Sequence, residues 1–430
     1  MVDQTAKRGM LKYRWVILIT LLVAYFFVYF HRMAPAVMND AISGSLGLSD
    51  GEFALITSVY FYTYLAMQIP SGLLADKFGP RYSAGLFLLL AALGSFLTAF
   101  SNDLAGLVIG KVMIAAGLAV VYIPMTKVMA VWFRKREFAS LNGAAISVGN
   151  VGAIAASAPL VLLMGLTDWR GVFLILAIVT VILGLASLLL VRNHPSERGY
   201  PSIEDIEEDE GVVKTESTSE KIPMIQGLKT VFMTGGMKFW MPTLAYFFVF
   251  GSIMLYAGLW GVKFYEVSQG FPQGSAAIFV MMVGVGKVIS PFILGMVTDK
   301  YGLSRKRIMI FGNICFFSTL VVMLFFMSSS SFWMWIFVNF MFGFFGGFMS
   351  LSFAQVKEWF PTALSARVIA GMNMFLFAGA AILQSVSALL VSGKTATFDD
   401  YQNILLMMAI CVAIACVLIS LSVEKKRERV

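Results

Sequence analysis

The sequence predicts an all-α membrane protein with twelve transmembrane helices, arranged as two six-helix bundles that are related by a pseudo-two-fold axis. Three observations predict this class. Of the 430 residues, 59% are hydrophobic and only 13% are charged, whereas soluble proteins carry about a quarter charged residues. The apolar residues form long runs, and a helix needs roughly 20 such residues to cross a bilayer. One short polar motif occurs in both halves of the chain.

The apolar runs place six spans in each half of the chain, with one long hydrophilic stretch between the halves. The first six spans are expected at Trp15–Met38, Phe53–Ala75, Tyr82–Phe100, Leu104–Ala130, Phe138–Met164 and Val172–Val191. The other six are expected at Phe239–Val262, Ala276–Val297, Ile308–Met327, Phe332–Ala354, Val368–Val391 and Ile404–Val423. The expected parts are therefore an N-terminal bundle over 1–191, a linker over 192–236 and a C-terminal bundle over 237–430. The linker holds an acidic run and a Ser/Thr-rich piece, which is typical of a solvated cytoplasmic segment.

Basic residues predict the orientation of the chain. Clusters such as Lys7–Arg14 and Arg134–Arg136 fall on one side of the membrane if the spans alternate, and few cations fall on the other side. Lysine and arginine concentrate on the cytoplasmic side of membrane proteins, so both termini are expected there. We expect a multi-pass protein of a bacterial inner membrane, monomeric in the lipid bilayer. The net charge of +8 lies in these clusters and does not indicate a nucleic-acid partner.

The sequence contains no pattern typical of an enzyme or a metalloprotein. Its three cysteines, Cys315, Cys411 and Cys416, lie in apolar runs and show no disulfide or metal-binding spacing. It also lacks a nucleotide-binding loop, a catalytic triad and a metal-ligand cluster. We therefore expect no cofactor and no enzymatic activity.

The repeated motif is a polar link between two apolar runs. Its first copy is Gly72-Leu73-Leu74-Ala75-Asp76-Lys77-Phe78-Gly79-Pro80-Arg81, and its second copy is Gly295-Met296-Val297-Thr298-Asp299-Lys300-Tyr301-Gly302. Glycine permits a tight reversal, and aspartate can accept hydrogen bonds from the free N–H groups that open a helix. The pattern resembles the signature loop of the major facilitator superfamily. The resemblance implies gating or conformational roles for Gly72, Asp76, Gly79, Arg81, Gly295, Asp299 and Gly302.

Further segments extend this resemblance over essentially the whole chain. Ala24–Phe30 matches Ala245–Gly251, so the two halves are similar to copies of one another. The segment His31-Arg32-Met33-Ala34-Pro35-Ala36 resembles the first-helix arginine segment of anion:cation symporters and organophosphate antiporters. Two related halves that close on a site near the middle of the membrane are the design of a rocking transporter.

The ionisable residues deep in the expected spans carry one sign of charge. A charge in a spanning helix costs several kcal/mol and marks a functional candidate. The deep residues are His31, Arg32, Lys111, Lys127 and Lys287. The carboxylates of the apolar runs lie instead at span ends: Asp40, Glu52, Glu266 and Glu358. Cations without acidic partners favour an anionic ligand.

Arg32 is the main candidate for the substrate site. Tyr25, Tyr29 and Arg32 fall on one helical face, and a guanidinium can hold a carboxylate or phosphate through two parallel hydrogen bonds. The alternative is an arginine that extends its side chain to the outer headgroups. The adjacent His31 could couple transport to protons, or could simply bond a backbone carbonyl.

Lys111, Tyr122 and Lys287 are further candidates for substrate contact. Lys111 and Tyr122 share a face of a straight helix, whereas Lys127 points nearly the other way and could reach the cytoplasmic surface. Lys287 lies in mid-span and is expected to act as a substrate or interdomain charge. Organophosphate antiporters also have an arginine in the seventh helix, at about the position of Met254 here. The incomplete pair favours a monocarboxylate or similar small anion over a sugar phosphate.

Taken together, the sequence predicts a secondary transporter that carries a small, carboxylate-like organic anion by alternating access, with uptake coupled to protons or another ion. An efflux antiporter of the same superfamily is one alternative, although the fifth span lacks the Gly-Pro pair of such members. A membrane sensor that binds an anionic metabolite without moving it is the other. Accumulation of a labelled anion by cells that express the chain would separate transport from sensing.

Overall fold

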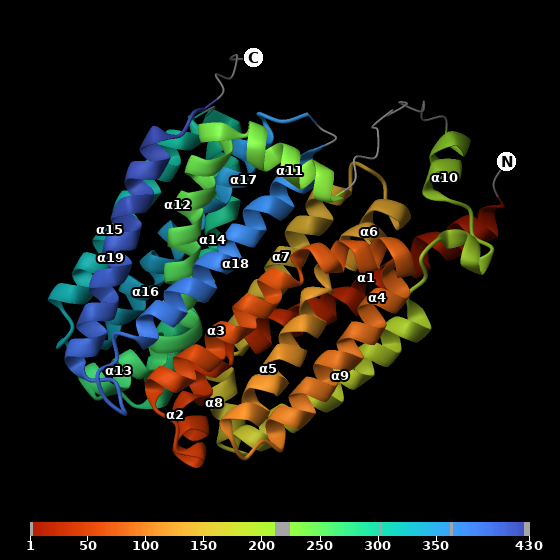
Figure 1. Ribbon diagram of the computed structural model, residues 1–430. Coiled ribbons are helices and arrows are strands. Elements are labelled where there is room, and N and C mark those ends of the chain that lie inside the picture. Colours follow the sequence, from red (N-terminus) through yellow and green to blue (C-terminus); the bar gives the residue numbers. More distant parts are fainter. Residues whose placement is uncertain (1–2, 211–223, 302, 362–363, 425–430) are drawn as a thin grey trace. The chain divides into compact units, whose positions relative to one another are not determined.

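Every element of the computed structural model is a helix, over the described residues 3–210, 224–301, 303–361 and 364–424 (Figure 1). Within this part of the chain ten helices are long and apolar enough to cross a membrane, and a pair bent by 45°, Ser140–Ala155 and Ala158–Met164, makes an eleventh span. The remaining expected span, Phe53–Ala75, corresponds to α3 (Asp50–Ala66) and the first residues of α4 (Gln68–Ala99). The backbone of α4 departs from helical geometry at Gly79. The all-α membrane class is therefore confirmed.

Several expected spans of the first half are broken into shorter helices. The elements are α1 (Gln4–Met33), α2 (Pro35–Leu46), α3, α4, α5 (Leu104–Ala119), α6 (Tyr122–Trp132), α7 (Phe138–Ala155), α8 (Ala158–Met164) and α9 (Trp169–Leu190). Pro35 takes the first position of α2, where its missing N–H costs no helical hydrogen bond. The fourth span runs from Leu104 to Trp132, and α5 and α6 within it are separated only by Val120 and Val121, which keep right-handed helical backbone angles.

The second half is also helical, and so is the region that connects the two halves. The connecting elements are η1 (Pro195–Arg198), α10 (Ile203–Asp209) and α11 (Met224–Thr234). The second half comprises α12 (Gly236–Leu255), the π-helix η2 (Tyr256–Trp260), α13 (Gly261–Gln269), α14 (Gln273–Tyr301), α15 (Arg305–Phe325), α16 (Phe332–Gly346), η3 (Gly347–Ser350), α17 (Leu351–Lys357), α18 (Ser365–Ala388) and α19 (Phe398–Leu421).

The chain forms two compact units, and each is described by itself. The first unit comprises Met1–Phe30, Ala66–Gly152 and Arg170–Glu220. The second unit comprises His31–Leu65, Ala153–Trp169 and Lys221–Val430, so it combines the C-terminal half with two pieces of the first half. The expected division into 1–191, 192–236 and 237–430 follows the sequence repeat and stays a prediction.

In the first unit, acidic side chains tie the loop between α6 and α7 to the start of α1. Glu137 accepts hydrogen bonds from Arg14 at 3.0 and 3.1 Å, and from the backbone N–H of Arg134 at 2.8 Å. Burial alone would raise the pKa of Glu137, but these donors hold that pKa below its ordinary value. Glu210, which directly follows α10, pairs with Lys7 at 3.0 Å and with Arg134 at 2.7 Å.

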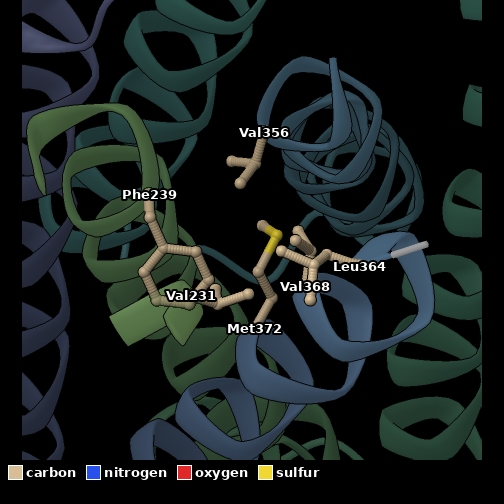
Figure 2. Close-up of a cluster of buried hydrophobic side chains, with 6 residues drawn as sticks. All are labelled: Val231, Phe239, Val356, Leu364, Val368 and Met372. Atoms are coloured by element: carbon tan, nitrogen blue, oxygen red, sulfur yellow. The ribbon is translucent and has the colours of Figure 1, made fainter. Parts of the chain in front are cut away.

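Two helices of the expected linker bury apolar side chains. In the first unit, Ile206 of α10 is fully buried. In the second unit, Val231 of α11 belongs to a buried cluster with residues of α12, α17, α18 and the N-cap of α18, Leu364 (Figure 2): Phe239, Val356, Leu364, Val368 and Met372. Burial of such surface stabilises the packed state. The prediction of a wholly solvated linker is therefore wrong for α10 and α11, while residues 211–223 lie outside the described part.

Close contact between α14 and α16 in the second unit depends on glycine. A Cβ at Gly286 would lie 2.3 Å from the carbonyl oxygen of Phe340, and a Cβ at Gly343 would lie 2.0 Å from that of Val283. Small residues are the usual means by which membrane helices approach so closely. In the same unit α12 packs along α18, and these helices carry the side chains described next (Figure 1).

Candidate functional site

Arg32 lies in the last turn of α1 and is packed between aromatic rings of the second unit. Its side chain is buried, with only 4% of the residue exposed. The guanidinium carbon lies 5.0 Å from the ring centre of Tyr64 on α3 and 5.1 Å from that of Phe377 on α18. The alternative of an arginine that extends to the headgroups is therefore wrong. Cation–π attraction holds the guanidinium on these two rings.

Lys287 reaches the same group of aromatic side chains from α14. Its Nζ lies 5.4 Å from the ring centre of Phe250 on α12, and the rings of Phe250 and Phe377 meet edge to face at 5.8 Å. Among the described residues no acidic side chain lies within 4.0 Å of the Lys287 ammonium group. We call Arg32, Tyr64, Phe250, Lys287 and Phe377 the two-cation cluster.

Met254, at the position where the family resemblance would place a second arginine, is buried in the second unit. Its carbonyl oxygen accepts a hydrogen bond from Nε2 of Gln384 at 3.1 Å. The second cation beside Arg32 thus comes from α14, through Lys287, and not from α12.

Tyr25, Tyr29 and Tyr122 come together in the first unit. The ring centres of Tyr25 and Tyr29 are 5.3 Å apart, and those of Tyr25 and Tyr122 are 5.4 Å apart. The hydroxyl of Tyr122 donates to Oδ1 of Asn142 at 2.8 Å. A Cβ at Gly149 would lie 2.8 Å from the ring of Tyr29, so α7 approaches α1 where it has no side chain. These contacts form an aromatic surface with phenol groups.

Lys111 lies in α5 and Tyr122 begins α6, and both helices belong to the single span Leu104–Trp132. The common face expected for these two residues stays a prediction. Lys111 is 3% exposed, and its Nζ lies 5.1 Å from the ring centre of Phe173 on α9. His31 is 2% exposed and directly precedes Arg32 in the last turn of α1.

The first copy of the repeated motif contains a kink inside α4. Gly79 has φ 72° and ψ 170°, a conformation that favours glycine, so the chain departs from helical geometry at this residue of the motif. The backbone N–H of Arg81 donates to Oδ1 of Asn193 at 3.0 Å, and its Nε donates to the carbonyl of Leu188 at 2.7 Å. Gly72 lies in the first part of α4.

Asp76 of this motif pairs with Lys127, the lysine that was expected to be able to reach the cytoplasmic surface. Nζ of Lys127 donates to Oδ1 of Asp76 at 2.7 Å and to the carbonyl of Ala75 at 2.8 Å. Asp76 therefore neutralises a side chain of α6, and the expectation that it bonds the N–H groups of a helix start is wrong. In the second copy, Gly302 lies outside the described residues. Gly295 and Asp299 lie in α14, but their surroundings are not described.

An ion-pair triad in the second unit, with one buried and one exposed carboxylate, was missed by sequence reasoning. Nζ of Lys263 on α13 lies 2.5 Å from Oδ1 of Asp50 and 2.7 Å from Oδ1 of Asp40. The other carboxylate oxygen of Asp50 accepts the N–H of Ala396 at 2.7 Å. All three charges lie near the ends of expected spans, where charge is common, so no local signal marked them.

Comparison with known proteins identifies the family to which this chain is similar. The model described as Major Facilitator Superfamily matches residues 21–286 and 274–430. The chain is 21% identical over 290 residues to the probable sulfoacetate transporter SauU of Cupriavidus necator, which covers 67% of this chain and 66% of that protein. It is 20% identical over 302 residues to a probable hexose phosphate transport protein of Chlamydia trachomatis, with 68% and 66% covered. The matched regions thus span just under two thirds of both relatives.

A third relative and two solved structures complete the comparison. The probable L-galactonate transporter of Escherichia coli is 26% identical over 166 residues, which cover 39% of this chain and 37% of that protein. The inward-facing, unoccupied bacterial homolog of the human lysosomal transporter Spinster superposes with a TM-score of 0.76 at 16% identity, over 95% of this chain and 96% of that one. The nucleoside transporter NupG superposes with a TM-score of 0.71 at 12% identity, over 94% and 98%. At these identities the structures show the fold alone.

Proposed function

This chain belongs to the Major Facilitator Superfamily, and on that premise we propose that it moves a small organic anion across the membrane by alternating access. The chain is a membrane transporter and not an enzyme. The observation that carries the proposal is the burial of Arg32 between the rings of Tyr64 and Phe377. An ionisable side chain within a spanning segment marks a functional site by default.

The chemistry of arginine supports an anionic substrate. Its planar guanidinium presents paired N–H donors that match the two oxygens of a carboxylate, and it also fits sulfonate and phosphate groups. The neighbouring Lys287 adds a second positive charge to the same cluster. Three relatives are named as transporters of sulfoacetate, hexose phosphate and L-galactonate, and all three of these compounds are organic anions.

Within the first unit, Tyr25, Tyr29 and Tyr122 stay proposed substrate contacts, because they offer ring faces and phenol groups. Lys111 is proposed as a substrate contact or a gating charge. The ion pair of Asp76 with Lys127 joins the repeated motif to α6, which suits a contact that forms and breaks during the transport cycle.

Coupling and orientation are part of the same proposal. We propose uptake with protons, for which the buried His31 beside Arg32 is the candidate group, because imidazole titrates near physiological pH. We also propose a bacterial inner membrane with both termini in the cytoplasm, on the basis of the basic clusters. Reporter fusions at each terminus would test this orientation.

The test is an uptake screen with purified protein in liposomes. Labelled carboxylates, sulfonates and organophosphates are offered with and without an inward proton gradient. We expect Arg32→Ala to abolish uptake and Arg32→Lys to leave a weak residual rate, because lysine keeps the charge but loses the paired donors. The matched control is Arg136→Ala, which removes an exposed arginine of a loop.

The outcomes distinguish the proposal from its alternatives. Uptake by Arg32→Ala at the rate of the unchanged protein would remove the site assignment. Acceleration by an outward proton gradient only would favour an efflux antiporter. Binding of an anion without any flux would favour a sensor.

A further inference from the structure

Three residues that directly follow α19 connect it to two other helices of the second unit. We call them the strap: Ser422, Val423 and Glu424. The carboxylate of Glu424 lies at the start of α15, where Oε1 accepts the backbone N–H of Arg305 at 2.7 Å and Oε2 accepts the hydroxyl of Ser304. The free N–H groups at the start of a helix favour a negative group there. Nζ of Lys306 also donates to the carbonyl of Ser422 at 2.7 Å, so the strap is bound to α15 at both of its ends.

The strap also holds the end of α17. Gln355 of this helix is 1% exposed, and its Nε2 donates to Oγ of Ser422 at 3.2 Å and to the carbonyl of Val423 at 3.1 Å. Nε1 of Trp359, which lies just beyond α17, donates to the same carbonyl at 3.2 Å. In the same unit α15 packs along α19 (Figure 1). The strap therefore joins α15, α17 and α19 at one end.

The helix α17 is the end of a span that a 3₁₀ segment interrupts. The elements α16, η3 and α17 form the single span Phe332–Lys357, and η3 occupies Gly347–Ser350 within it. A stretch of 3₁₀-helix inside a longer helix often marks a hinge. Beyond this segment, α17 is held by the apolar cluster of Figure 2, through Val356, and by the strap. Movement of α17 about η3 therefore requires release of its bonds to the strap.

We propose that the strap is a latch that holds α17 in place, and that Glu424 sets how often α17 opens about η3. The carboxylate anchors the strap on α15 because both of its oxygens accept donors there. Gln355 carries this anchoring over to α17. The latch is a conformational device of the fold, and it does not depend on which substrate the protein carries.

Hydrogen exchange of the purified protein in lipid nanodiscs tests the latch, because backbone amides exchange when their helix opens. We expect Glu424→Gln to speed exchange in α17 by about fivefold or more, since an amide nitrogen cannot accept the donors of α15. Gln355→Met should also speed exchange in α17, but should leave the first turn of α15 unchanged. The ion pair of Arg305 with Glu358, at 2.5 Å, remains in both variants. The control is Glu204→Gln, which changes an exposed glutamate of α10 and should not alter exchange in α17.

Three outcomes would overturn the inference. If Glu424→Gln speeds exchange only in the first turn of α15, Glu424 is a local helix cap. If Gln355→Met leaves exchange in α17 unchanged, the strap does not hold this helix. In the double variant, exchange in α17 should be at most about twice that of the faster single variant, because both changes break one connection. Effects that multiply instead would mean two independent contacts. Should one single variant fail to fold, exchange in α17 of the other still decides the matter.

Discussion

Replacement of Lys263 by methionine should destabilise the protein more than removal of either of its acidic partners. Lys263 holds Asp50 at 2.5 Å and Asp40 at 2.7 Å. The two carboxylates differ greatly in exposure, because 2% of the Asp50 side chain is accessible to solvent and 52% of the Asp40 side chain is accessible. The triad therefore contains one buried pair and one largely solvated pair.

The expected sizes follow from these exposures. Without Lys263, the buried Asp50 keeps only backbone donors such as the N–H of Ala396, and loss of one partner of a buried pair costs about 3–5 kcal/mol. Asp50→Asn leaves an amide oxygen that can still accept this N–H and leaves Lys263 paired with Asp40, so about 1–3 kcal/mol is expected. Asp40→Asn removes a solvated pair worth about 0–1 kcal/mol.

Thermal melting of the purified protein in detergent measures this order. The melting temperature should fall most for Lys263→Met, less for Asp50→Asn and least for Asp40→Asn. The control is Lys229→Met, which removes an exposed lysine of α11 and should change little. In the double variant with Asp50→Asn and Lys263→Met, the loss should be smaller than the sum of the single losses, because the two residues interact. A Lys263→Met protein that melts no lower than Asp40→Asn would refute the reasoning.

Two further predictions concern the first unit. Glu137→Gln should cost about 1–2 kcal/mol at neutral pH, because it weakens the two hydrogen bonds from Arg14. Since the folded pKa of Glu137 is lowered, its contribution is present above the unfolded pKa and is lost as pH falls through the folded pKa, so melting curves of the two proteins should converge in acid. Gly79→Ala should cost about 1–3 kcal/mol, because φ is 72° and the new Cβ would lie 2.4 Å from Oδ1 of Asn193. Gly44→Ala, with no atom within 4 Å of its new Cβ, is the control, and equal melting temperatures of the two variants would contradict the strain argument.

The spans could be predicted because the bilayer makes one simple demand, a long apolar run that satisfies its own backbone hydrogen bonds. Breaks within the spans could not be predicted in the same way. The chain between Ala119 and Tyr122 is as apolar as the helices on either side, so composition does not mark the end of α5. The span itself continues on both sides of this interruption, from Leu104 to Trp132. Gly79 is the contrary case, since a glycine beside a proline in a polar link is a local signal and the chain departs from helical geometry there.

For the candidate site, the sequence could predict only which charged residues lie within apolar spans, where a charge is costly. The sequence does not distinguish between three cations that each have apolar neighbours: Arg32, Lys127 and Lys287. The structure separates them by their surroundings: Lys127 donates to Asp76, 51 residues away, whereas Lys287 lies over an aromatic ring with no described carboxylate within 4.0 Å. Lys263 directly follows an expected span, and its ammonium group donates to an aspartate 213 residues away. Such pairings join residues that are far apart in the sequence, so they could not be predicted from one sequence. They decide which lysines already have an acidic partner. Of these lysines, we therefore keep Lys287 as the proposed contact for an anionic substrate.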